Sequence, residues 1–118
     1  MTKEDNRIKY VTFIDETTKN SFDKLKVGKF EDKELYAFID RAIDDLKKNP
    51  FVGIKIPKKQ WPKEYVKKYN INNLWKYDLP NGWRLIYTIK GDAVEVVSII
   101  LEWFDHKTYN RRFKYGKK

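Results

Sequence analysis

The sequence contains no cysteine, one histidine and one methionine in 118 residues. A chain without cysteine forms no disulfide and no thiolate zinc site, and it offers no cysteine nucleophile. Long hydrophobic runs are also missing. Nowhere do eighteen uncharged apolar residues follow one another, and the first residues, MTKED, lack the apolar stretch of a signal peptide. These absences predict a cytoplasmic protein that does not enter a membrane.

Aromatic residues make up 16% of the chain and hydrophobic residues 41%. This content suffices for a folded core and leaves aromatic side chains for the surface. A chain of this length has the usual size of one domain and no room for a second independent core. We therefore expect a single domain over residues 1–118, with flexible ends at 1–7 and 114–118.

Acidic residues are scarce in the second half of the chain. Residues 1–50 carry 11 Lys and Arg and 11 Asp and Glu, whereas residues 51–118 carry 15 and 6, so the whole net charge of +9 lies in the second half. A segregated positive charge attracts polyanions, of which nucleic acid is the commonest. An acidic protein, anionic lipid or a merely lysine-rich surface would also fit this charge distribution.

The first half of the sequence predicts one strand and two helices. Residues 8–14, IKYVTFI, read as a strand, and residues 15–26 as a short helix capped by Asp15 or Thr17. Residues 32–48 place apolar side chains at the spacing of one buried helical face, and Pro50 ends that helix.

The second half predicts a connecting segment, three strands and a last helix. Residues 51–72 connect, with one helical turn near 64–69, and strands follow at 74–79, 83–90 and 93–103 before a helix at 105–113. The last strand is apolar at nearly every position over 96–101, which is typical of a central strand. The predicted fold class is α+β, an antiparallel four-stranded sheet with two helices on one face and the other face open.

Five motifs follow one another in an order that resembles the RelE/ParE toxin superfamily. They are a helix ending in LKKNP, a loop with Gly53, the hairpin LWKYDLPNGWRLIYTI, an apolar strand and the closing segment HKTYNRRF. The similarity covers about residues 8–113. In that family the second helix ends at Asn-Pro, and a strand similar to WRLIY follows a glycine turn. The resemblance implies a ribosome-dependent mRNA endonuclease neutralised by an antitoxin, although the ParE branch acts on gyrase. Fold transfers more safely than activity between such relatives.

Three residues match the catalytic positions of that family. Arg84 matches its strand arginine, which the resemblance assigns to phosphate binding, and a guanidinium fork suits phosphate oxygens at any working pH. Imidazole, with an ordinary pKa of about 6.5, both donates and accepts protons near neutrality, and the chain has one, at His106. Tyr109 matches the family's tyrosine. The alternative for Arg84 and His106 is an ordinary exposed side chain.

The second predicted strand, residues 74–79, departs from the family, which often has basic residues there, whereas this chain has Trp75, Lys76, Tyr77 and Asp78. With a two-residue Asn81-Gly82 turn, Leu79 pairs with Arg84, so that Trp75 and Tyr77 share the face of Arg84; a turn one residue longer reverses this. Aromatic side chains on that face favour base stacking over activation of a hydroxyl. Relatives also often carry an arginine where this chain reads LEWFD, with Trp103.

Phosphate and base contacts are expected from residues before, within and after the hairpin. The predicted RNA-binding residues are Lys55, Lys58, Lys59, Trp75, Lys76, Tyr77, Arg111 and Arg112. Glu102, Asp105 and His106 form only a weak metal-site signal, because no second histidine or cysteine accompanies them. We therefore expect no metal and no cofactor, with the RNA 2'-hydroxyl as nucleophile.

The sequence thus predicts a metal-independent, ribosome-associated endoribonuclease that cleaves mRNA and is held inactive by an acidic antitoxin protein. Arg84 would stabilise the phosphorane, His106 would act as general acid or base, and Tyr109 would orient or stack. A non-catalytic RNA or ribosome binding module on the same fold is the alternative. A gyrase-directed toxin of the ParE type is a further one.

Overall fold

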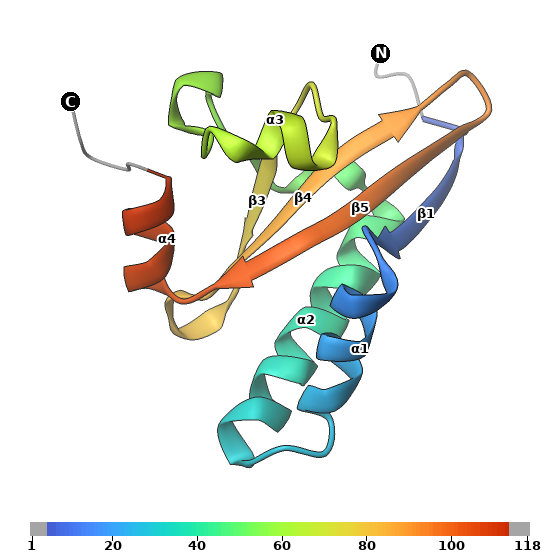
Figure 1. Ribbon diagram of the computed structural model, residues 1–118. Coiled ribbons are helices and arrows are strands. Elements are labelled where there is room, and N and C mark those ends of the chain that lie inside the picture. Colours follow the sequence, from blue (N-terminus) through green and yellow to red (C-terminus); the bar gives the residue numbers. More distant parts are fainter. Residues whose placement is uncertain (1–4, 114–118) are drawn as a thin grey trace.

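The computed structural model describes residues 5–113 of the chain (Figure 1). Residues 1–4 and 114–118, which hold most of the two ends expected to be flexible, lie outside the described residues. The helices and strands follow in this order: β1 (Ile8–Phe13), α1 (Glu16–Leu25), α2 (Phe30–Lys48), β2 (Ile54–Lys55), α3 (Glu64–Tyr69), β3 (Trp75–Asp78), β4 (Arg84–Gly91), β5 (Glu95–Phe104) and α4 (His106–Arg112).

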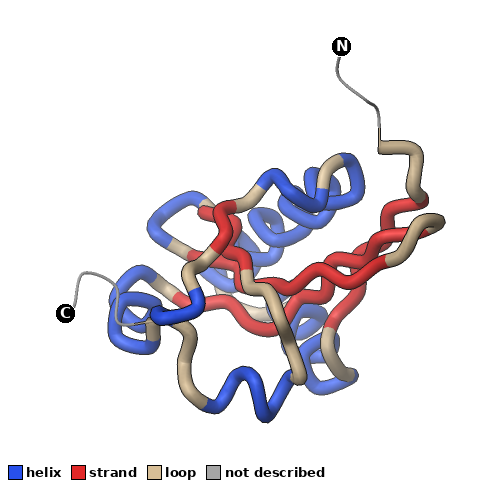
Figure 2. Tube along the Cα trace, turned by 90° about the horizontal axis from the view of Figure 1, so that it is seen from above, coloured by secondary structure: helices blue, strands red, loops and turns tan. Residues whose placement is uncertain are grey.

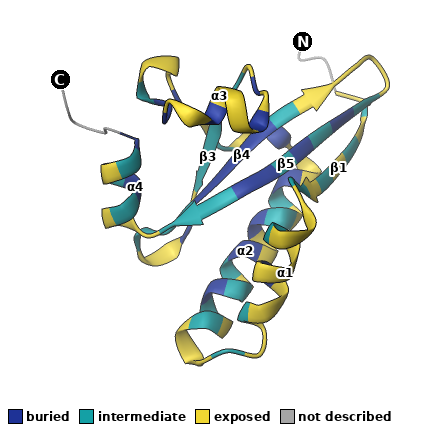
Figure 3. Ribbon diagram, viewed as in Figure 1, coloured by how far each residue is buried: buried dark blue, intermediate teal, exposed yellow. Residues whose placement is uncertain are grey.

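Helices α1 and α2 form where the sequence predicts them. Asp15 caps α1, because its side chain accepts a hydrogen bond from the backbone N–H of Thr18. Helix α2 begins two residues earlier than expected and ends at Lys48, where Asn49 takes an extended backbone ahead of Pro50. Figure 3 colours buried and exposed residues in alternation along α2, and the buried ones, Leu35, Ile39, Ala42 and Leu46, belong to the core that α2 shares with the sheet.

The sheet is mixed and has five strands, in the order β1-β5-β4-β3-β2. The expected fully antiparallel, four-stranded sheet is therefore wrong in two respects, although the α+β class is confirmed. Strand β1 runs parallel to β5, and β2 adds a two-residue strand on β3. The local sequence indicates neither feature. The direction of β1 in the sheet depends on the helical hairpin that follows it, and a strand of two residues, such as β2, is too short to show a periodic pattern. Strand β5 lies between β1 and β4, which confirms its expected internal position.

The turn between β3 and β4 is one residue longer than the two-residue turn expected. Asp78 pairs with Arg84, and the backbone N–H of Leu79 donates to the carbonyl of Trp83, so that Pro80, Asn81 and Gly82 form the loop. A two-residue turn would require the residue at position 80 to donate its N–H to Trp83, and proline has none. Asn81 and Gly82 both take positive φ, 61° and 80°.

This shift of one residue exchanges the two faces of β3. Trp75 and Tyr77 pair with Tyr87 and Leu85, on the side of the sheet that packs against α2. Lys76, which lies opposite Ile86, shares the other face with Arg84. The expected grouping of Trp75 and Tyr77 with Arg84 is therefore wrong, because side chains alternate with a period of two along a strand.

The sheet face opposite α2 is largely covered, contrary to the expectation of an open face. Segment 56–71, which includes α3, folds back over it, and α4 closes the end near β3 (Figures 1 and 2). Ile56, Trp61 and Tyr65 pack there against Ile86 and Leu101. The segment that the sequence predicted only as a connection thus contributes to a second apolar core, because its aromatic side chains bury large areas.

Candidate functional site

Three strand ends and the start of α4 meet at one corner of the sheet. Asp78 at the end of β3 pairs with Arg84 at the start of β4, and Arg84 pairs with Phe104 at the end of β5. Asp105 follows at once and caps α4 by accepting from the backbone N–H of Thr108. That hydrogen bond lowers the pKa of the Asp105 carboxyl. The cap begins the helix at His106.

Arg84 lies at the centre of this corner, with 18% of its side chain exposed. Its Nη2 is 3.4 Å from His106 Nδ1, and its guanidinium carbon is 5.7 Å from the centre of the Tyr109 ring. Its Nε is 3.1 Å from Asp78 Oδ1. The structure therefore brings together Arg84, His106 and Tyr109, the three residues that the sequence proposed as catalytic.

Lys76 is the second cation of the corner. Its side chain is 15% exposed, its Nζ lies 3.0 Å from Asp78 Oδ1, and it is 5.7 Å from the centre of the Tyr109 ring. Tyr109 is itself 2% exposed and stacks on Phe113 in the second core. The Tyr109 ring is therefore held in place beside Lys76 and Arg84, and its negative π-face stabilises both cations. The ring is too buried to stack on a base.

The imidazole of His106 is exposed and contacts a side chain at each nitrogen. Because a guanidinium can only donate, Nδ1 accepts from Arg84 in the neutral ring, and the proton then lies on Nε2. Nε2 is 3.2 Å from the amide nitrogen of Asn110, one helical turn later. A half-turn of that amide presents its oxygen to the Nε2 proton. Asn110 therefore positions His106, a role that sequence reasoning missed.

Apart from Lys76, the predicted RNA-binding residues divide into three groups. Lys55, Lys58, Lys59 and Arg111 are exposed. Arg112 pairs with Glu64 at 3.2 Å and lies over the rings of Tyr65 and Phe104, so that it joins α4 to α3.

Trp75 and Tyr77 form the third group, on the α2 side of the sheet. Trp75 contacts Phe51 and donates through its indole to Asn73, whereas Tyr77 donates its hydroxyl proton to Asp45 on α2. Both side chains are partly buried among these partners. They lie away from the cluster of Lys76, Asp78, Arg84, His106, Tyr109 and Asn110, which we call the basic corner.

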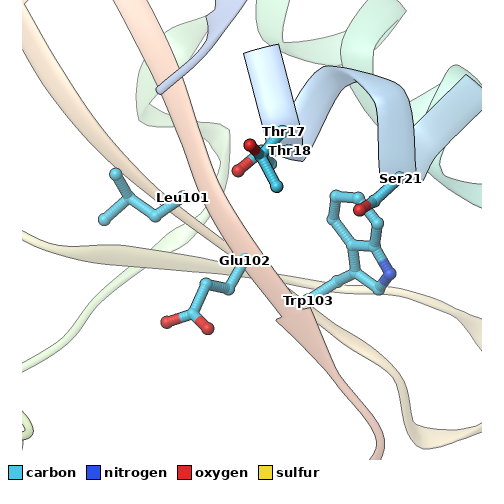
Figure 4. Close-up of a pocket in the computed structure, with 6 residues that line it drawn as sticks. All are labelled: Thr17, Thr18, Ser21, Leu101, Glu102 and Trp103. Carbon is cyan, nitrogen blue, oxygen red and sulfur yellow. The ribbon is translucent and has the colours of Figure 1, made fainter. Parts of the chain in front are cut away.

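Glu102 and Trp103 line a pocket of about 270 Å³ between α1 and the end of β5 (Figure 4). The two side chains leave β5 on opposite sides, and the carboxylate of Glu102 turns away from Thr17 and Thr18. It accepts the hydroxyl proton of Tyr65 instead. Burial raises the pKa of Tyr65 well above its usual range, and the hydrogen bond to the Glu102 carboxylate adds to this effect. Glu102 is thus a structural acceptor beside this pocket.

Within residues 5–113, no three histidine, cysteine, aspartate or glutamate side chains lie together in a way that could hold a metal ion. No helix of that range has the length and apolar character that crossing a bilayer requires.

The basic corner combines two largely buried cations, Lys76 and Arg84, with the exposed imidazole of His106 and the carboxylate of Asp78. Such a set can bind a phosphate group and move a proton next to it. Comparison of the chain with known protein families, with curated proteins and with solved structures found no match in any of the three.

Proposed function

We propose that this chain is a RelE/ParE-like endoribonuclease of the cytoplasm that cleaves mRNA, in association with the ribosome, without a metal ion. The observation that carries the proposal is the basic corner, where Arg84 and Lys76 lie beside His106. The corner assembles from the same residues, Arg84, His106 and Tyr109, that match the catalytic positions of the resembled family. An acidic antitoxin protein would neutralise the toxin by covering this positive surface.

The cleavage step uses the RNA's own 2'-hydroxyl. Its oxygen attacks the adjacent phosphorus, the bond from phosphorus to the 5'-oxygen breaks, and the products end in a 2',3'-cyclic phosphate and a 5'-hydroxyl. One proton leaves the 2'-oxygen and one reaches the 5'-oxygen, and His106 serves as general acid or base in this exchange. Arg84 and Lys76 stabilise the charge of the phosphorane. Tyr109 holds the two cations in place rather than stacking on a base.

The experiment that tests this function combines growth with product analysis. Induced expression of the wild-type chain should arrest a bacterial host, and the purified protein should convert ribosome-bound mRNA into fragments with cyclic phosphate ends. Arg84→Ala should relieve the arrest and abolish cleavage while the protein stays folded. Arg41→Ala, which removes an exposed arginine on α2, is the matched control and should behave as wild type.

A non-catalytic RNA or ribosome binding module is the second candidate. It is favoured by Asp78, which pairs with both cations of the corner and thereby weakens their field. This alternative is supported if the folded wild-type protein binds RNA but neither cleaves it nor arrests growth.

A further inference from the structure

One carboxylate oxygen stands between the two cations of the basic corner. Asp78 Oδ1 lies 3.0 Å from Lys76 Nζ and 3.1 Å from Arg84 Nε. The two cationic side chains are 15% and 18% exposed, whereas 47% of the Asp78 side chain is exposed. The cations are therefore held by the fold, and the carboxylate is the member of the cluster that can turn into water.

Asp78 neutralises Arg84 without satisfying its donors. Arg84 Nε is shielded from solvent and has no aligned hydrogen-bond acceptor among the described residues, although Asp78 Oδ1 is close to it. A shielded N–H without an aligned acceptor costs free energy. A phosphate group carries oxygens in tetrahedral directions, and it can accept from Nε and Nη of a guanidinium while it also contacts an ammonium.

The Asp78 carboxylate can rotate away from the two cations into solvent. Strand β2 pairs only with Trp75 and Lys76, so the backbone edge of β3 at Asp78 has no strand partner beyond β4 among residues 5–113. A rotation of the carboxylate away from Arg84 would break its two ion pairs and none of the ladder hydrogen bonds.

We propose that Asp78 is an internal competitor for phosphate: its carboxylate occupies the position of a phosphate oxygen between Lys76 and Arg84, and an RNA phosphate displaces it on binding. This inference rests on the proposed function, because it assigns the ligand of the same site and how that site is restrained. Ligands with several phosphates along a chain overcome the competition more readily than a single free anion does, since neighbouring contacts add to their affinity.

The first arm of the test measures inorganic phosphate binding by nuclear magnetic resonance, through the Nε–H signal of Arg84. Asp78→Asn keeps size and shape but removes the competing charge, and it should bind phosphate about tenfold more tightly than wild type if the site is free in about a tenth of the wild-type molecules. Asp44→Asn, an exposed carboxylate on α2, makes the same change in net charge and should leave affinity within about twofold. Asp78→Ser provides a second variant in case the amide forms new hydrogen bonds.

Equal phosphate affinity in wild type, Asp78→Asn and Asp78→Ser overturns the inference, as does an equal gain in Asp44→Asn. The second arm repeats the comparison with a fluorescent ten-nucleotide single-stranded RNA. Tighter RNA binding by the Asp78 variants supports both the inference and the proposed function. Tighter phosphate binding without RNA binding by any variant supports the role of Asp78 and rejects the RNA-directed function.

Discussion

Arg84 combines the contacts on which the basic corner depends. Its guanidinium lies beside His106, Asp78 and the ring of Tyr109, and its backbone belongs to β4, whose neighbours are fixed by pairing on both sides. A side chain held in this way loses little further freedom when it binds a phosphate. Lysine in its place would keep the charge and lose the planar fork, so the two are not equivalent here.

His106 carries the proton-transfer role in the proposed reaction. His106→Gln keeps polarity and approximate size, so RNA affinity should stay within about twofold while the single-turnover cleavage rate falls by about 100-fold or more. Cleavage of ribosome-bound mRNA and fluorescence anisotropy measure the two quantities. Lys107→Gln, on the next residue of α4, should leave both unchanged. A His106→Gln protein that cleaves at the wild-type rate would remove this residue from the mechanism.

Strand β3 joins the two layers of the molecule at the scale of the elements. Lys76 and Asp78 enter the basic corner on one face, whereas Tyr77, on the other, donates to Asp45 of α2. The same strand therefore positions the site and attaches the sheet to its helical layer. Burial, then the hydrogen bond to Asp45 and its negative charge, raises the pKa of Tyr77 to about 12.

Tyr77 should make the protein sensitive to alkaline pH. Because its folded pKa lies above the ordinary value of 10, the stability from its protonated form is present below pH 10 and is lost as the pH rises through 12. Tyr77→Phe should cost about 1 kcal/mol at pH 7, and its free energy of unfolding should fall less between pH 10 and 12. A residual fall remains, because burial also raises the pKa of Tyr87 to about 12.

Urea unfolding of wild type and variant at several pH values measures this effect. Asp45→Asn, which keeps an acceptor oxygen but removes the charge, should give an intermediate result. An alkaline loss in Tyr77→Phe as large as that of wild type would show that the hydrogen bond to Asp45 contributes nothing to it.

At the scale of the whole molecule, basic side chains are concentrated on the segment that covers the sheet face opposite α2. Segment 55–68 carries six lysines and one acidic residue. Lys55, Lys58 and Lys59 among them are exposed, and Lys55 lies on β2 opposite Trp75 of β3. The tip of the α1 and α2 hairpin is instead mixed in charge. We therefore expect RNA to contact the covered sheet face and the basic corner together.

Salt dependence of RNA binding measures these phosphate contacts. Affinity for single-stranded RNA should fall steeply between low and moderate salt, and replacing Lys55, Lys58 and Lys59 by glutamine should reduce the slope of log K against log salt by about 2. The same replacement at Lys24, Lys29 and Lys33, exposed on the helical hairpin, removes equal charge and should leave the slope as in wild type. A slope near zero in the wild type, or equal slopes in both triple variants, would show that the basic half is not an RNA surface.

Local patterns in the sequence were enough to predict most of the elements. The apolar spacing in 32–48, the cap at Asp15 and the helical turn at 64–69 each depend on neighbours within a few residues, and each is found in the structure. Arg84, His106 and Tyr109 could be proposed from type and order alone, and they lie together. What the sequence by itself determined is therefore the longer helices and strands, the charge of each half and the residue types of the site.

Tertiary structure alone decided how these elements share faces and edges. The parallel pairing of β1 with β5 depends on the path of the chain through a helical hairpin, and the coverage of the second face depends on where aromatic residues of a connecting segment find a partner. The loop at Pro80 shows the reason at the smallest scale: one missing N–H lengthens a turn by a residue, and alternation then moves Lys76 and Asp78 beside Arg84. Side-chain direction along a strand is set by pairing, and pairing is a property of the folded sheet.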